Sequence, residues 1–491
     1  MSEPIASIYE QLQNLPIFSK ETSSTNLDDG FIEEHPRFEK LSLRGLSLSS
    51  ATVEPLEEIL KRIKFKSIDL ECVEFEDADA AIAIIEMMEF YDSTIDLSIG
   101  YHSETLVPRV WACLAKLVRQ SACLKSIDIK ASYMPDATIT IWCRAIRGAI
   151  NIRTLHLEQT SLSGKPFSLL CVALHHNRTV QELFLADNNL NTNDMKSFAF
   201  ALKLNRVVCL LDLRNNKLGD SGVRELCYAL NQQCSAYEQS KKGSNNENGD
   251  DENAKDKELL EDSDQIDKIS LATSQCSTQE NNETGVQTLV LWNNHITGAS
   301  MPALSQVIRK YKWLVTLNLG QNPKLGDDGV FSLRPGLQRA KLQRLGMYNC
   351  GLECEAAVAI AEVIAEARYL IRIDLRKNDI RFSGIMALAH ALRENTKLLF
   401  LNIDSGKFSI KKNYNKRGQN NNNSKNTNRT PSSDDSDNDD KSSGKESDGA
   451  ESELADHQLK FAKLIDEYQK RNQEMLKASQ EGVEHTGNDD A

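Results

Sequence analysis

The feature that most constrains this chain is one pattern of apolar residues and asparagine that returns every 28 positions. The pattern reads apolar-x-x-Leu-x-Leu-x-x-Asn-x-Leu, as in Val180 to Leu190, and it recurs from Val208 to Leu218. A degenerate copy lies near Leu97 and Ile99. Further copies open at Phe38, Phe65, Leu124, Ile152, Val286, Leu314, Leu342, Leu370 and Leu398. About a dozen units with a fixed period of this size indicate a solenoid.

Each unit is expected to contain one short strand and one helix. The Leu-x-Leu alternation predicts a strand with both leucines on its buried face, lying parallel to the strand of the next unit. The segment Asp220 to Leu230 shows apolar residues three and four positions apart, which is the spacing of an amphipathic helix. One unit cannot bury its apolar face alone, so stacked units share a continuous core. The prediction is an α/β fold, a leucine-rich-repeat solenoid in the form of a horseshoe, with parallel strands on the concave face and helices on the convex face.

The asparagine of the pattern stands where the chain leaves the strand. A side-chain amide at that point can satisfy backbone groups that the turn would otherwise leave unpaired. The column consists of Asn188, Asn216, Asn294, Asn322 and Asn378.

Two breaks in the period divide the chain. Val208 and Val286 are 78 residues apart, one step of 28 plus 50, and the excess is acidic and rich in Asn, Ser and Gln. Such a stretch cannot bury enough apolar surface to order itself. The expected organisation is an N-terminal helix or cap at 1–37, repeats at 38–233, a disordered acidic insertion at 234–284, repeats at 285–405, a disordered charged segment at 406–453, a terminal amphipathic helix at 454–478 and a disordered tail at 479–491.

Composition favours an intracellular protein that binds neither nucleic acid nor membrane. A net charge of −13 argues against general nucleic-acid binding. The first residues show no signal peptide, and no apolar run reaches the roughly 18 residues that cross a bilayer. The eleven cysteines have no second pair that would complete a zinc site. We expect a cytoplasmic or nuclear location and reduced thiols.

Catalysis is not expected, nor is a cofactor or metal. The segment from Gly219 to Gly222 resembles a serine-protease nucleophile motif, but Gly326 to Gly329 takes the same turn position in another unit. The sequence contains no HExxH, GxxxxGK[ST] or GxGxxG motif.

The exposed side of the strands is therefore the candidate binding surface. Residues between and after the two leucines face the concave side, and aromatic and arginine side chains are enriched at interface hot spots. The alternative is a solvated sheet with scattered charge. The candidates are Phe184, Asp212, Arg214, Trp292, Asn318, Tyr348, Asp374 and Arg376.

Four runs of sequence resemble the protein phosphatase 1 regulatory subunit 37 family. They are Leu155 to Gly164, Leu183 to Leu190, Leu289 to Asn294 and Leu317 to Pro323, and they include non-consensus residues such as Trp292. The resemblance implies a non-catalytic regulatory, inhibitory subunit that binds the catalytic subunit of serine/threonine protein phosphatase 1. The alternative hypothesis is a structural scaffold for another intracellular protein, such as a cytoskeletal component.

The resemblance also implies a docking motif of the form Arg/Lys-Val/Ile-x-Phe, which the phosphatase accepts as an added edge strand. The one match is Arg62-Ile63-Lys64-Phe65, so Arg62, Ile63 and Phe65 are docking candidates. Family members carry this motif ahead of the repeats, whereas here Phe65 opens a repeat strand. Its expected burial favours a structural role for the match.

Overall fold

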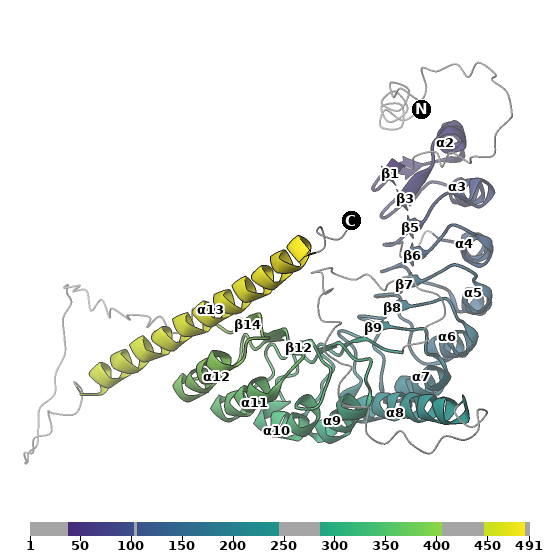
Figure 1. Cartoon of the computed structure of the whole chain (residues 1–491). Coiled ribbons are helices and arrows are strands. Elements are labelled where there is room, and N and C mark those ends of the chain that lie inside the picture. Colours follow the sequence, from purple (N-terminus) through teal and green to yellow (C-terminus); the bar gives the residue numbers. More distant parts are fainter. Residues whose placement is uncertain (1–37, 103–105, 245–284, 405–445, 487–491) are drawn as a thin grey trace, which may run out of the picture.

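The repeats form one continuous parallel sheet that curves along the inner side of an arc, as a computed structural model shows (Figure 1). The structure describes residues 38–102, 106–244, 285–404 and 446–486. Twelve strands follow one another in the order β1-β3-β5-β6-β7-β8-β9-β10-β11-β12-β13-β14. Their bounds are β1 Phe38–Ser42, β3 Phe65–Asp69, β5 Asp96–Ser98, β6 Ser126–Asp128, β7 Thr154–His156, β8 Glu182–Phe184, β9 Leu210–Asp212, β10 Thr288–Val290, β11 Thr316–Asn318, β12 Arg344–Gly346, β13 Arg372–Asp374 and β14 Phe400–Asn402.

The helices cover the outer side of the arc (Figure 1). A second, two-stranded sheet joins β2 (Ser47–Leu48) to β4 (Glu74–Phe75) between the first two units. The helix bounds are α2 Ser50–Arg62, α3 Ala78–Tyr91, α4 Pro108–Gln120, α5 Asp136–Gly148, α6 Lys165–His176, α7 Thr192–Leu204, α8 Gly219–Ser244, the 3₁₀ turn η1 Gly298–Ser300, α9 Met301–Lys310, α10 Gly326–Leu337, α11 Cys354–Glu366, α12 Phe382–Glu394 and α13 Glu446–Thr486.

One hydrophobic core runs through all the repeats. Leu185, Leu213 and Leu291 come from three units and belong to the same buried cluster, with no exposed surface. The central leucines of neighbouring strands pair in register, as Leu183 does with Leu211. The predicted solenoid with parallel strands inside and helices outside is therefore confirmed.

The asparagine column links neighbouring repeats by hydrogen bonds. The Asn216 Oδ1 accepts from the backbone N–H groups of Asn188 (3.1 Å) and Leu190 (3.0 Å). Its Nδ2 donates to the carbonyls of Leu185 (2.9 Å) and Leu213 (3.0 Å). Each amide thus satisfies groups of the preceding unit as well as its own, as predicted. The same contacts recur at Asn188, Asn322 and Asn378.

The residue before the asparagine position of the pattern adopts a left-handed backbone conformation in ten repeats, whether or not asparagine follows it. The φ angle lies between 50° and 63° at these positions, and only three of the ten residues are themselves asparagine. This conformation costs energy for residues other than glycine. In nine of the ten repeats, all but that of Lys377, the residue's own N–H donates to a backbone carbonyl of the next repeat, which holds the turn in place. The ten are Cys72, Tyr101, Ala131, Gln159, Asp187, Asn215, Asn293, Gln321, Asn349 and Lys377.

The sheet continues across the interruption in the repeat. Leu211 of β9 pairs directly with Leu289 of β10, although 78 residues separate them. On the helical side, the hydroxyl of Tyr311 accepts from the N–H of Val286 (2.7 Å) and donates to the Gln233 Oε1 (2.7 Å). This buried hydroxyl thereby joins α8, which precedes the gap, to the strand-leading residue that follows it. We call Gln233, Val286 and Tyr311 the staple.

Helix α13 lies across the end of the repeat array, against α12 and β14 of the last repeat (Figure 1). The Gln469 side chain pairs with the backbone of Leu401, accepting from its N–H (2.7 Å) and donating to its carbonyl (3.3 Å), much as another strand would. The Asn472 Nδ2 donates to the carbonyls of Asn395 (3.0 Å) and Leu398 (2.8 Å). In the preceding unit, Asn395 itself donates to the carbonyl of Ala367 (3.2 Å), so Asn472 continues that row.

Three expected boundaries require correction. The insertion is expected at 234–284, but α8 extends to Ser244, and Cys234 at the expected boundary is buried in the core. The charged segment and the terminal helix are expected at 406–453 and 454–478, but α13 already begins at Glu446. It continues to Thr486, into the expected tail. Polar residues at both ends hide the helix limits in the sequence. The expected N-terminal helix lies outside the described residues.

Candidate protein-binding site

Strand geometry places the concave side chains in two rows. The last residue of each strand forms the first row, and the residue two positions later, beyond the second buried leucine, forms the second row. The first row contains the predicted Phe184, Asp212, Asn318 and Asp374, with Val290 and Gly346 between them. The second row contains the predicted Arg214, Trp292, Tyr348 and Arg376, with Gly320 between the two aromatic residues.

An aromatic stack spans three repeats of the second row. The rings of Trp292 and Tyr348 lie 5.1 Å apart between centroids at an angle of 26°, although a whole repeat separates them. Gly320 makes the contact possible, because a Cβ there would lie 2.3 Å from two atoms of the Trp292 ring. The indole therefore lies over the glycine backbone and reaches the second unit along. Stacked pairs of this kind contribute about 0.5–1.5 kcal/mol beyond burial.

Two cations extend the stack to the next repeat. The guanidinium of Arg376 lies 5.8 Å from the centre of the Tyr348 ring, and the Lys377 Nζ lies 5.4 Å from it. Arg376 is held by Asp374 through its Nε (2.9 Å) and Nη2 (2.6 Å), and this ion pair raises the pKa of the arginine. The structure therefore joins Trp292, Tyr348 and Arg376 into one continuous surface, which we call the ladder face.

Asn318 supports the ladder face from the first row. Its Oδ1 accepts from the backbone N–H of Gly320 (3.0 Å), which fixes the glycine beneath the indole. A Cβ on the neighbouring Gly346 would approach the same oxygen to 2.7 Å. Asn318 is thus engaged by the protein, and its role at the surface is to hold the turn.

Asp212 and Arg214 form a second pair of the same spacing as Asp374 and Arg376. Arg214 binds Asp212 through its Nη2 (2.7 Å) and Nε (3.1 Å). Burial raises the pKa of Asp212, although the charge and hydrogen bonds of Arg214 act in the opposite direction. Asp212 is only 4% exposed, so it leaves Arg214 as the side chain open to a partner.

Phe184 lies apart from the ladder face and has a neighbour that sequence reasoning missed. The His156 ring stacks on Phe184 at 4.2 Å and 10°, and its Nδ1 lies 3.3 Å from the Glu158 Oε1. Burial alone would lower the pKa of His156, but the hydrogen bond and charge of Glu158, with the charge of Asp128, raise it. His156 stands 28 residues before Phe184, so its membership of the first row was readable from the period.

Further concave side chains come from the first position of each strand. Arg344 and Arg372 are exposed there, and the Arg372 guanidinium lies 4.4 Å from the centre of the Phe400 ring. These residues point to the same side as the first row because strand side chains alternate. They were missed because only positions between and after the leucines were considered.

The N-terminal part of the concave face is neutralised by its own charges. Lys130 contacts both Glu71 and Asp128 at 2.8 Å, and Lys40 contacts Asp69 at 2.7 Å. Such partly buried pairs satisfy one another and leave little for a partner to gain. The aromatic and cationic side chains of β10 to β14 are the more favourable surface.

The docking candidates lie at the other end of the arc. Arg62 ends α2, and Ile63 and Phe65 are 2% and 3% exposed in the core. Phe65 opens β3, where its ring lies 6.1 Å from that of Phe38. The motif would have to leave the sheet before its two apolar side chains could enter another protein.

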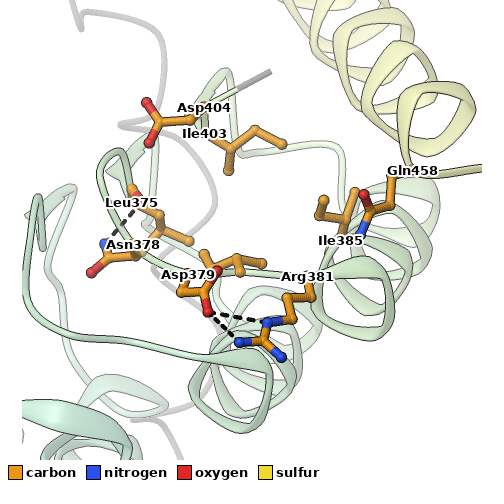
Figure 2. A pocket seen from close by; sticks show the side chains of 9 residues that line it. Leu375, Asn378, Asp379, Arg381, Ile385, Ile403, Asp404 and Gln458 are labelled. Carbon is orange, nitrogen blue, oxygen red and sulfur yellow. Dashed lines mark hydrogen bonds and ion pairs between the residues drawn. The ribbon is translucent and has the colours of Figure 1, made fainter. Parts of the chain in front are cut away.

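A cavity of about 150 Å³ lies at the last repeat, between the turn after β13 and the Gln458 of α13. Asp379 pairs with Arg381 at its edge, at 2.7 Å. Figure 2 shows Ile403 and Asp404 on the opposite side. In earlier repeats the asparagine of the next unit enters behind the corresponding turn. We therefore assign this cavity to the end of the repeat array.

Neither a metal site nor a membrane span is found in the described ranges. No three His, Cys, Asp or Glu residues gather there as metal ligands would. Among the same residues, no helix combines the length and apolar character needed to cross a bilayer. The turn at Gly219 begins α8 with a φ of +57°, and Gly326 begins α10 with +63°, as the turn interpretation predicts.

Comparison with known proteins gives the same repeat. The family model described as Leucine Rich repeat matches residues 210–227 and 312–333, which cover a strand and part of the following helix in two units. The chain has the leucine-rich-repeat fold. Among solved structures, this chain is similar to the crystal structure of the Rad7 and Elc1 complex in yeast, with 16% identity over 71% of this chain and 79% of that chain and a TM-score of 0.35.

Curated relatives confirm the resemblance seen in the sequence. This chain is 37% identical over 140 residues to the protein phosphatase 1 regulatory subunit 37 homolog of Caenorhabditis briggsae, covering 28% of this chain and 15% of that protein. It is 36% identical over 130 residues to protein phosphatase 1 regulatory subunit 37 of Bos taurus, covering 26% and 18%. The chain therefore spans less than a fifth of these relatives.

Proposed function

We propose that this protein is a non-catalytic regulatory subunit that binds, and inhibits, the catalytic subunit of protein phosphatase 1. The observation that carries the proposal is the similarity to proteins named as regulatory subunits of that phosphatase. The similarity supports a regulatory, protein-binding role, and the choice of this phosphatase and of inhibition is the proposal. Its setting is intracellular, in cytoplasm or nucleus.

The ladder face is the proposed contact surface. It presents two stacked aromatic rings and an arginine whose carboxylate partner holds it in place. Rings that are already stacked lose little conformational freedom on binding, and aromatic and arginine residues dominate interface energies. Burial of Ile63 and Phe65 speaks against the Arg62 segment as the main contact.

The test is binding of the purified full chain to purified phosphatase catalytic subunit, measured by biolayer interferometry. We expect binding, and Trp292→Ala should weaken it about 30-fold, as the loss of a 2 kcal/mol hot spot does. Phe90→Ala is the matched control, because Phe90 is 82% exposed on α3, a helix on the outer side of the arc. Phosphatase activity on a phosphoprotein should fall as the chain is added.

Absence of binding by the unaltered chain would remove the phosphatase assignment and leave the scaffold hypothesis. Binding that Trp292→Ala and Phe90→Ala leave equally strong would remove the ladder face as the contact. Comparing Phe65→Ala with Val53→Ala, a buried α2 substitution outside the motif, separates loss of docking from loss of stability.

A further inference from the structure

The convex face carries a row of exposed apolar side chains at the repeat spacing. Val172 on α6, Phe200 on α7 and Tyr228 on α8 are each 28 residues apart and are 51%, 64% and 56% exposed. Leu204 of α7, 53% exposed, lies one helical turn from Phe200. A contiguous row of this kind differs from isolated surface hydrophobics, which need no explanation. We call Val172, Phe200 and Tyr228 the convex stripe.

Basic side chains without carboxylate partners surround the convex stripe. Arg144 and Arg147 on α5 and Lys196 and Lys203 on α7 are exposed, and none forms an ion pair within the described residues. The only acid of α6 and α7 is Asp194, which is buried and accepts from the Gly164 N–H. The outer faces of α6 and α7 are therefore positive, whereas α8 carries Glu225 about one helical turn from Tyr228.

Several cations on other convex helices are neutralised by ion pairs. Lys116 of α4 contacts Glu89 of α3 at 2.8 Å, and Arg334 of α10 pairs with Glu362 of α11. The contrast indicates that unpaired positive charge over α5 to α7 is not a property of the whole outer surface.

Histidines at the end of α6 report the same positive surroundings. Partial desolvation and the charges of Arg147, His175 and Arg178 lower the pKa of His176. The His175 ring stacks on Phe200 at 5.0 Å and 14°, which holds the phenyl ring of the convex stripe in one position.

We propose that the convex face of α5 to α8 binds an acidic segment of a partner protein that carries apolar side chains. Packed helices lie about 10 Å apart, so three of them give the convex stripe a length of about 20 Å. That length matches about 13 residues of helix or six of extended chain. A line one residue wide suits a single segment better than a lipid surface. The concave face points the other way, so this proposal is independent of the proposed function.

The probe is a fluorescent 20-residue peptide of glutamates with leucines at every third or fourth position, titrated with the full chain at low salt. We expect the affinity to fall at least tenfold for Phe200→Ser and for the double variant Arg144→Glu/Arg147→Glu. Phe90→Ser, on the paired region of the convex face, should bind like the unaltered chain. A salt series should weaken binding, since the contacts are ionic at the rim.

Three results would overturn the proposal. One is that Phe200→Ser and the double variant both bind the acidic peptide with an affinity within twofold of that of the unaltered chain. Another is equal binding of the matching lysine peptide. The third is binding of phosphatidylserine vesicles or duplex DNA, lost in the same variants, without binding of the peptide.

The chain itself supplies another possible occupant, which the same assay distinguishes. Residues 245–284, which follow α8 in sequence, contain 12 Asp and Glu against 3 Lys. A chain in which a Gly-Ser linker of equal length replaces them should bind the peptide as the unaltered chain does. If only the replaced chain binds, the chain's own segment competes for the convex face, and the assignment to a partner protein is wrong.

Discussion

Removing one oxygen atom tests how the solenoid tolerates its interruption. Tyr311→Phe deletes the hydroxyl group of the staple. Tyr311 is only 2% exposed, and its hydroxyl makes two hydrogen bonds of 2.7 Å. The phenyl ring keeps its packing, but the N–H of Val286 and the Gln233 Oε1 lose their partner. Each unsatisfied buried polar group costs about 1–3 kcal/mol. We expect the free energy of unfolding to fall by about 2–4 kcal/mol, since the nearby chain can relax.

Hydrogen exchange locates the effect. The amide of Val286 should exchange at least about 30-fold faster in the variant, the factor that corresponds to 2 kcal/mol. Amides of β5 and β6 should be unchanged, because each repeat contacts only its neighbours. Urea unfolding followed by circular dichroism gives the accompanying loss of stability.

Two controls make the outcome interpretable. Tyr228→Phe removes a hydroxyl from a tyrosine that is 56% exposed, and it should change stability by less than about 0.5 kcal/mol. Gly285→Ala disturbs the staple sterically while keeping the Tyr311 hydroxyl, because a Cβ at residue 285 would lie 2.2 Å from that hydroxyl and the φ of Gly285 is +83°. A Tyr311→Phe protein as stable as Tyr228→Phe would refute the reasoning.

Three further predictions follow from the concave side. Gly320→Ala should displace Trp292 from Tyr348, altering the near-ultraviolet circular dichroism and lowering stability by about 0.5–1.5 kcal/mol; an unchanged spectrum would contradict the stack. Asn216→Ala should lower the free energy of unfolding in urea more than Asn294→Ala does, because the Asn294 Oδ1 has no hydrogen-bond partner, whereas the Asn216 side chain uses both its Oδ1 and its Nδ2. Equal losses of stability would contradict the proposed role of the asparagine column. The folded pKa of His156 is raised above its usual value of 6.5. The stabilisation that this histidine provides is therefore complete below pH 6.5 and is lost as the pH rises through the folded pKa. The difference in stability between the unaltered chain and His156→Gln should shrink as the pH rises, and a difference that grows would contradict this prediction.

The fold was predictable because one spacing determines it. The leucines at 183, 211 and 289 specify the buried face of three strands. The period places the first two units side by side, and the return of the same pattern after the interruption places the third next to them. The asparagine column was equally readable, since an amide at a strand end has few other uses in a buried position. Helix limits at Ser244 and Glu446 were not readable, because polar helical turns beyond the core resemble polar loops.

The candidate site was only partly predictable. The period identifies which residues share a row, but it says nothing of how far a side chain reaches along that row. Contact between Trp292 and Tyr348 depends on the missing side chain of Gly320, a residue that the pattern treats as variable. In the same way, Asp212 was expected at the surface, and the sequence alone does not show that Arg214 covers its carboxylate.

The Gln469 amide has a consequence for assembly. A terminal strand with unpaired backbone groups invites pairing with another molecule. By occupying the N–H and carbonyl of Leu401, one glutamine in a helix ends the hydrogen-bonding sequence that every earlier strand passes on. Helix α13 thereby works against polymerisation at this end, and it allows a modular array to exist as a molecule of fixed length.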